Sequence, residues 1–271
     1  MQLFARGIHA CVRRDVLEDR RVHWVYSAAM RRTLYGLMQS PWTERARWAL
    51  DHHGVTYAYH EHVPMLGEVL LRRKARTSKA SVPLLADGDD VVMGSFEIAK
   101  HAEKIGRGAP LFPRDKDAEV AHWADVAERM TRAGRVWLFS RFGKRKAAQA
   151  EALPSFVPGG LRGAFAPSAG MAIRFLAKKY DVSENAEAEV EHTLRPLLLD
   201  LRAAIGKGTY LLAPSSFSFA DVAMASTLHV VRPRERLQLG PAMREAWTNE
   251  ALAEEFGDLL TWRDAIYAKH R

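Results

Sequence analysis

Apolar runs alternate with amphipathic stretches between residues 33 and 105. Short apolar runs bounded by polar residues predict strands, whereas apolar positions spaced three and four apart predict helices. Ser40-Pro41 is typical of a helix start, because the missing N–H of proline costs nothing in the first turn, and Gly54 suits the helix end. Asp87-Gly88 between two apolar runs predicts a hairpin turn. The expected order is β-α-β-α-β-β-α, with strands at 33–37, 55–60, 82–85 and 91–93 and helices at 41–54, 66–76 and 95–105.

From residue 115 onward the apolar positions follow only the helical period. A Gly/Pro-rich linker at 106–113 separates this part from the first. Ser218 and Asp221 have the spacing of a capping box at the start of a helix, with aspartate in place of the usual Glu or Gln. We assign this pair a structural role. The expected helices cover 115–150, 162–180, 184–206, 219–230 and 241–268.

These patterns divide the chain into three parts. Residues 30–107 are expected to form an α/β domain and residues 114–271 an all-helical domain. Residues 1–29 show no clean periodicity and precede Met30, which stands just before the first convincing strand. We therefore expect 1–29 to be an accessory extension, of the kind that a start codon assigned too far upstream would add.

Composition excludes several kinds of chemistry. No run approaches the roughly 18 apolar residues of a membrane helix, so we expect a soluble protein without a membrane partner. Cys11 is the single cysteine, which rules out an internal disulfide, a Cys-based zinc site or a dithiol pair within the chain. The histidines show no metal-ligand spacing, His52-His53 is expected to be exposed, and no metal is implied.

The net charge of +8 favours anionic partners, among them nucleic acid and small acidic metabolites. The basic residues are scattered apart from a cluster at 72–79, and no nucleic-acid recognition motif is present. We therefore expect a solvated basic surface and no nucleic-acid partner.

Four motifs resemble those of the cytosolic glutathione S-transferases, over roughly residues 32–268. Residues 40–50 are similar to the first-helix motif, in which a catalytic Ser or Cys precedes an Arg-x-Arg-apolar-Ala-Leu segment. Val82-Pro83 resembles the Val–cis-Pro pair of the family, Gly94-Ser95 stands where the family has Glu/Gln-Ser, and the capping box at Ser218 agrees as well. The resemblance implies the glutathione transferase fold: a thioredoxin-like α/β domain that binds glutathione, followed by an all-α domain.

The resemblance also implies roles for individual residues. Ser40 would donate a hydrogen bond to the thiolate of glutathione; as a residue before Pro41 it also suits a plain N-cap. Val82 would pair with the peptide backbone of glutathione, with Pro83 in the cis form. Ser95, after Gly94, would meet the γ-glutamyl carboxylate at a helix N-terminus. Lys79, with Arg76 as a second candidate, would hold the glycine carboxylate, although surface cations are usually only solvated.

A cytoplasmic homodimer is implied in the same way, with glutathione as co-substrate and a small hydrophobic electrophile as second substrate. The electrophile pocket is expected between the domains, beside the helix around Trp123, Met130 and Trp137, although such a stripe is more often core.

Two other functions remain to be weighed against glutathione conjugation. A non-catalytic binding or scaffold protein of the same fold is the main alternative, and Gly94 and the altered segment before Val82 favour it. A glutaredoxin-like thiol transferase is disfavoured, because Ser40 carries no thiol and Cys11 lies in the extension.

Overall fold

The computed structural model describes residues 32–271 except 155–156, 207 and 213–216. The expected extension at 1–29, with Cys11, and the first two residues of the expected domain at 30–107 lie outside the described residues.

A four-stranded mixed sheet forms the first part, with the order β2-β1-β3-β4. Strand β1 (Arg32–Gly36) pairs in parallel with β2 (Ala58–Glu61), as the expected βαβ unit requires. Strand β3 (Leu84–Asp87) pairs antiparallel with β1 and forms the expected hairpin with β4 (Asp90–Met93).

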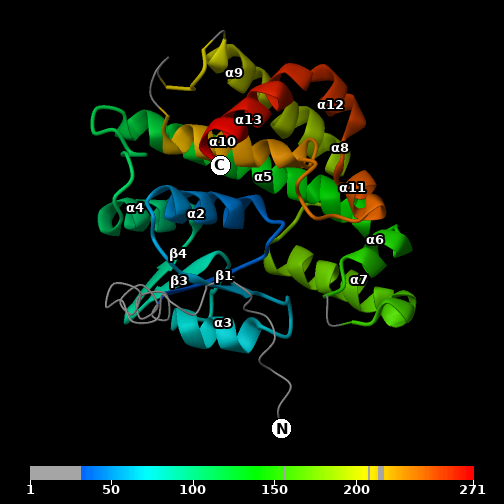
Figure 1. The fold of residues 1–271 in the computed structure, drawn as a ribbon. Helices are drawn as coiled ribbons and strands as arrows, with labels where there is room; N and C mark the ends of the chain where they lie inside the picture. Colours follow the sequence, from blue (N-terminus) through cyan, green and yellow to red (C-terminus); the bar gives the residue numbers. More distant parts are fainter. Residues whose placement is uncertain (1–31, 155–156, 207, 213–216) are drawn as a thin grey trace, which may run out of the picture.

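Helices cover both faces of this sheet (Figure 1). Helices α2 (Pro41–His52) and α4 (Ser95–Ile105) lie on the face toward the rest of the chain, and α3 (Glu68–Ala75) lies on the other. Trp48, Ala49 and Leu50 of α2 are fully buried, whereas α3 buries only Glu68 and Leu71. The face with α2 and α4 therefore carries most of the apolar contact.

The second part is helical throughout the residues that the structure describes. Two of the expected helices are interrupted: 115–150 divides at Gly143, which caps α5, and 241–268 divides into three helices. One of these breaks arises because the Asn249 side chain accepts a hydrogen bond from the Leu252 N–H at 3.2 Å, which starts a new helix. The helices are α5 (Asp117–Phe142), α6 (Lys146–Glu151), α7 (Arg162–Lys179), α8 (Ala186–Glu189), α9 (Arg195–Ile205), α10 (Phe219–Thr227), α11 (Pro241–Trp247), α12 (Glu250–Glu255) and α13 (Gly257–His270), with 3-10 turns η2 (Gly159–Leu161) and η4 (Leu228–Val230) and a π-helical turn η3 (Val190–Leu194). None of the helices within 32–271, the gaps left aside, is long and apolar enough to cross a bilayer.

One hydrophobic core runs through both parts of the molecule. It includes Leu34 of β1 and Trp48 of α2 together with Met130 of α5 and Phe256, all of them fully buried. Helix α10 lies at its centre, and all nine of its residues are buried. The sheet and the helical part are therefore joined by continuous apolar packing.

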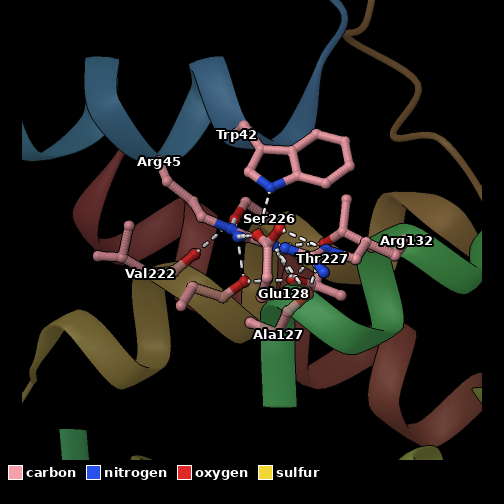
Figure 2. Close-up of polar contacts among 10 residues, drawn as sticks. Trp42, Arg45, Ala127, Glu128, Arg132, Val222, Ser226 and Thr227 are labelled. Atoms are coloured by element: carbon pink, nitrogen blue, oxygen red, sulfur yellow. Dashed lines mark hydrogen bonds and ion pairs between the residues drawn. The ribbon is translucent and has the colours of Figure 1, made fainter. Parts of the chain in front are cut away.

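A buried guanidinium also joins the two parts (Figure 2). Arg45, on the inner face of α2, is only 2% exposed. Its Nη2 donates to the Ala127 carbonyl at 3.1 Å, to the Thr227 hydroxyl at 2.6 Å and to the Thr131 hydroxyl. Its Nε donates to the Ser226 hydroxyl at 3.3 Å. Helix α2 is thereby hydrogen-bonded to α5 and α10 at once.

The three hydroxyls are oriented as acceptors by their own helices. The Thr131 hydroxyl donates to the Ala127 carbonyl at 2.6 Å, and the Thr227 hydroxyl donates to the Ala223 carbonyl at 2.7 Å. Each hydroxyl has one proton, so its remaining lone pairs are available to Arg45. Burial lowers the pKa of Arg45 to about 10, and the nearby Glu128 carboxylate opposes this effect, so the side chain stays charged at neutral pH.

Replacing Arg45 by alanine should lower the free energy of unfolding by about 3 kcal/mol, because several charge-assisted hydrogen bonds in a buried site are lost together. Arg47 on the same helix is a matched control. Its Nη1 lies 3.7 Å from Glu44 and its side chain is 27% exposed, so Arg47→Ala should cost less than about 1 kcal/mol. Urea unfolding followed by tryptophan fluorescence measures both values. Equal losses in the two variants would contradict this assignment.

The expected capping box is confirmed at the start of α10. The Ser218 N–H donates to Asp221 Oδ2 at 2.9 Å, and the Ser218 hydroxyl donates to the same oxygen at 3.0 Å. The second carboxylate oxygen accepts the Leu211 N–H at 2.8 Å. Burial raises the pKa of Asp221, although these hydrogen bonds favour the charged form. The box therefore also holds the backbone at Leu211.

Ser218→Ala should cost about 1 kcal/mol of unfolding free energy, the usual cost of losing a cap. Asp221→Ala should cost about 2–3 kcal/mol, because it leaves the buried N–H groups of Ser218 and Leu211 without acceptors. Thermal unfolding of the two variants gives two midpoints, and the midpoint of Asp221→Ala should be the lower one. A larger effect from Ser218→Ala would exclude the carboxylate as the anchoring group.

His229 of η4 is another buried polar residue, at 4% exposure, and its Nε2 has no hydrogen-bond partner in the described chain. Burial, together with the positive charges of Arg263 and Arg234, lowers its pKa to about 3. His53, expected to be exposed, is also buried, and burial likewise lowers its pKa.

Acid should therefore destabilise the protein through these histidines. The unfolded chain takes up protons below the ordinary histidine pKa of 6.5, whereas folded His229 does not until about pH 3. Stability from this group is complete above 6.5 and falls as the pH decreases, by up to about 1.4 kcal/mol per pH unit. His229→Phe should reduce the loss of unfolding free energy between about pH 7.5 and about pH 5.5. These two values lie on either side of the pKa of an unfolded histidine. An unchanged loss would show that His229 does not contribute.

Candidate functional site

A cleft of about 2390 Å³ lies between the sheet part and helices α5 and α7. From the sheet part it is lined by the turn before α2, the segment before β3 and the start of α4. Five of the six residues singled out from the sequence line this one cleft: Ser40, Val82, Pro83, Gly94 and Ser95.

Ser40 lies at the N-terminus of α2 in an extended conformation (φ −74°, ψ 130°). Its backbone groups are engaged: its N–H donates to the Leu37 carbonyl at 2.9 Å, and its C=O accepts the Glu44 N–H at 3.0 Å. Its side chain makes no capping hydrogen bond, so the interpretation of Ser40 as a side-chain N-cap is not supported. The hydroxyl is thus available at the edge of the cleft, beside the positive end of a helix.

Val82 and Pro83 lead into β3. The peptide bond between them is cis, as the motif predicts. The Pro83 carbonyl accepts the Gly94 N–H at 3.0 Å, which holds this segment against the start of α4. Within the described residues, the N–H and C=O of Val82 have no backbone partner. Val82 therefore offers an unpaired donor and acceptor to an extended peptide.

Gly94 and Ser95 start α4. Gly94 has φ 93° and ψ 142°, a region open essentially to glycine alone. This backbone explains why a glycine stands where the resembling family has Glu or Gln. Ser95 is the first residue of the helix and is 7% exposed, in the cleft wall. The unpaired N–H groups of the first turn of α4 make this wall suitable for a carboxylate.

Lys79 is not brought into the cleft. It is exposed, and neither it nor Arg76 is among the lining residues. Another lysine, Lys179 at the end of α7, lines the cleft, and its Nζ lies 2.9 Å from the carboxylate of Glu68. Glu68 also contacts His62 at 3.2 Å. This ion pair joins α7 to α3, so the lysine is already engaged.

The helical wall of the cleft includes α5, as expected, but through different side chains, and it also includes α7. Trp123, Met130 and Trp137 do not line it, because Met130 is fully buried in the core and the two tryptophans pack against that core. The lining residues of α5 are instead on the face that carries Glu128 and Arg135.

Arg45 and Glu128 are structural parts of the site that the sequence analysis did not single out. Glu128 accepts a hydrogen bond from the Trp42 indole N–H, and it lies 3.8 Å from Arg45. It also binds Arg132 Nε at 2.8 Å. The signal for Arg45 was present in the sequence, because Arg45 stands three and four residues before Trp48 and Ala49 on the apolar face of the helix.

Among the described residues, no group of three or more His, Cys, Asp or Glu side chains is placed to hold a metal ion.

Comparison with known proteins gives one matching family. Residues 34–110 match the family model described as glutathione S-transferase, N-terminal domain. No curated protein matches the chain in sequence.

Solved structures of similar fold cover most of the chain. The beta-etherase LigF from Sphingobium sp. strain SYK-6 has 18% identity and a TM-score of 0.56, over 88% of this chain and 96% of that chain. A glutathione S-transferase from Methylobacterium radiotolerans in complex with glutathione sulfonate has 16% identity and a TM-score of 0.56, over 88% and 90%. One from Ceriporiopsis subvermispora in complex with glutathione has 13% identity and a TM-score of 0.59, over 88% and 95%. Residues 34–110 therefore match the model of the glutathione S-transferase N-terminal domain, and the chain has the glutathione S-transferase fold.

Proposed function

We propose that the protein binds glutathione in the cleft and transfers its thiolate to a hydrophobic electrophile. The observation that carries this proposal is the meeting of Ser40, Val82 and Ser95 in one cleft, with the Ser40 side chain free of a capping bond. Glutathione in the structures of two proteins of similar fold supports the choice of ligand.

Each part of glutathione has a counterpart in the cleft. The unpaired N–H and C=O of Val82 would bind the cysteinyl unit as an added strand. The start of α4 at Ser95 would bind the γ-glutamyl carboxylate. With the tripeptide so placed, its sulfur would lie toward the Ser40 hydroxyl.

Ser40 would stabilise the thiolate, the reactive form of the thiol. Its hydroxyl donates a hydrogen bond to the sulfur, and the N-terminus of α2 adds a favourable dipole. The thiol proton leaves to solvent, the sulfur forms a bond to the electrophilic carbon, and the leaving group departs with its electron pair. Apolar side chains on the helical wall, among them Leu138 of α5 and Phe165 of α7, would hold the electrophile. By the same resemblance we propose a cytoplasmic homodimer.

A non-catalytic binding or scaffold protein is the second candidate, and Gly94 is the observation that favours it. The side chain that the resembling family carries before the serine is absent here, and with it one contact to the ligand.

Ser40→Ala tests the transferase proposal. A hydrogen bond to a charged acceptor contributes about 1.5–3 kcal/mol, so kcat/KM with glutathione and 1-chloro-2,4-dinitrobenzene should fall roughly 10- to 100-fold. The pH at which the rate is half-maximal should rise toward the pKa of a free thiol, about 8.5. Glutathione binding, measured by calorimetry, should persist.

Ser140→Ala is the control, because the Ser140 hydroxyl on α5 bonds to the Trp137 carbonyl at 2.8 Å and does not line the cleft. It should leave the rate unchanged. An unchanged rate in Ser40→Ala would remove Ser40 from the mechanism. No heat of binding with millimolar glutathione would support the scaffold instead.

A further inference from the structure

The helical wall of the cleft contains a cation held between two aromatic rings. The guanidinium of Arg135 on α5 lies over the Trp42 ring at 5.1 Å and over the Tyr180 ring at 4.6 Å. Trp42 belongs to the first turn of α2, and Tyr180 follows the last residue of α7. All three residues line the cleft. Three elements distant in sequence therefore hold this side chain in place.

No described carboxylate pairs with Arg135, and its Nε is buried without a hydrogen-bond partner. The nearest acidic group on its helix, Glu128, is already engaged. Its Oε1 accepts from Arg132 at 2.8 Å, and its Oε2 accepts from the Trp42 indole. Burial lowers the pKa of Arg135 and the nearby Arg132 also lowers it, whereas Tyr180 and the more distant charge of Glu128 raise it. The guanidinium nevertheless remains protonated, as arginine does in proteins.

This arrangement suits an anionic ligand. A partly buried charge without a counter-ion is unfavourable, and a carboxylate would compensate it. The rings meet the cation through their faces, whereas the five N–H donors of a guanidinium lie in its own plane. The aromatic contacts therefore consume none of the donors that a carboxylate needs.

The surroundings limit the ligand further. Leu138 and Phe139 lie on the next turn of α5, and Phe165 and Met171 of α7 also line the cleft. Phe165 is 52% exposed and Met171 is 48% exposed, so both present apolar surface to a ligand. A molecule with a planar apolar body and one carboxylate would satisfy both the rings and the cation.

We propose that Arg135 binds the carboxylate of an aromatic carboxylic acid, and that such acids are the class of electrophile this cleft accepts. The second statement rests on the proposed transferase function, whereas the first does not. Arg135 determines specificity: it selects the second substrate and takes no part in stabilising the thiolate. It belongs to α5 on the helical wall, whereas Val82 and Ser95, to which glutathione is assigned, belong to the sheet part.

Calorimetric titration of the full chain with 2-naphthoate and 2-naphthamide tests the anion site, because the two probes match in shape and differ in charge. A charge-assisted pair should make naphthoate bind about tenfold more tightly, with or without saturating glutathione. Arg135→Gln should abolish this preference, and Arg135→Lys should retain part of it. Arg129→Gln is the matched control: Arg129 is exposed on the same helix and does not line the cleft.

The substrate class is tested by rates with 4-chloro-3,5-dinitrobenzoate and 1-chloro-2,4-dinitrobenzene. Arg135→Gln should lower the ratio of kcat/KM for the first to kcat/KM for the second about tenfold. Naphthoate preference without any glutathione binding would support the anion site and remove the transferase. A wild-type protein without the preference, or an Arg135→Gln protein that keeps it, would overturn the site. Loss of glutathione binding in Arg135→Gln would also overturn it, because the cation would then belong to glutathione.

Discussion

The burial of one charged side chain constrains the whole molecule. Arg45 cannot enter an apolar core unless acceptors surround its guanidinium, because an unpaired buried charge is strongly unfavourable. The acceptors come from α5 and α10, so α2 can occupy only the position and rotation that bring Arg45 to them. Ser40 and Trp42 lie on the first residues of the same helix. Their placement at the cleft therefore depends on the contacts that Arg45 makes one turn further along α2.

The cleft combines a polar wall with an apolar one. The sheet part contributes backbone groups, a hydroxyl and a helix N-terminus, whereas α5 and α7 contribute side chains. The positions of backbone groups are set by the fold more than by residue identity. The groups that side chains offer change directly when a residue is replaced. In the proposed function, recognition of glutathione and of the electrophile would thus be divided between two parts of the structure that tolerate substitution differently.

The order of strands and helices could be predicted from the sequence, because strand runs, helix starts and the Asp-Gly turn are signalled by neighbouring residues. The meeting of Ser40, Val82 and Ser95 was also predicted, through the resemblance of their motifs. The role of Arg45 was not, since its hydrogen-bond partners are 82 to 182 residues away. The same limit applies to Arg135, whose aromatic partners come from α2 and from the end of α7. His53 was assigned to the surface because a histidine pair at a helix end is polar, yet tertiary packing buries it.

The backbone at Gly94 also restricts how this cleft can change. Its φ of 93° and ψ of 142° leave space beside the Cα, since an added Cβ would meet no atom within 4 Å. The obstacle to a larger residue is therefore local torsion and not crowding. A glutamine introduced there would have to change the backbone of the turn between β4 and α4 before it could reach a ligand. Position 94 therefore has space for a side chain but a backbone that disfavours one, so new contacts in this cleft are easier to gain from the helical wall.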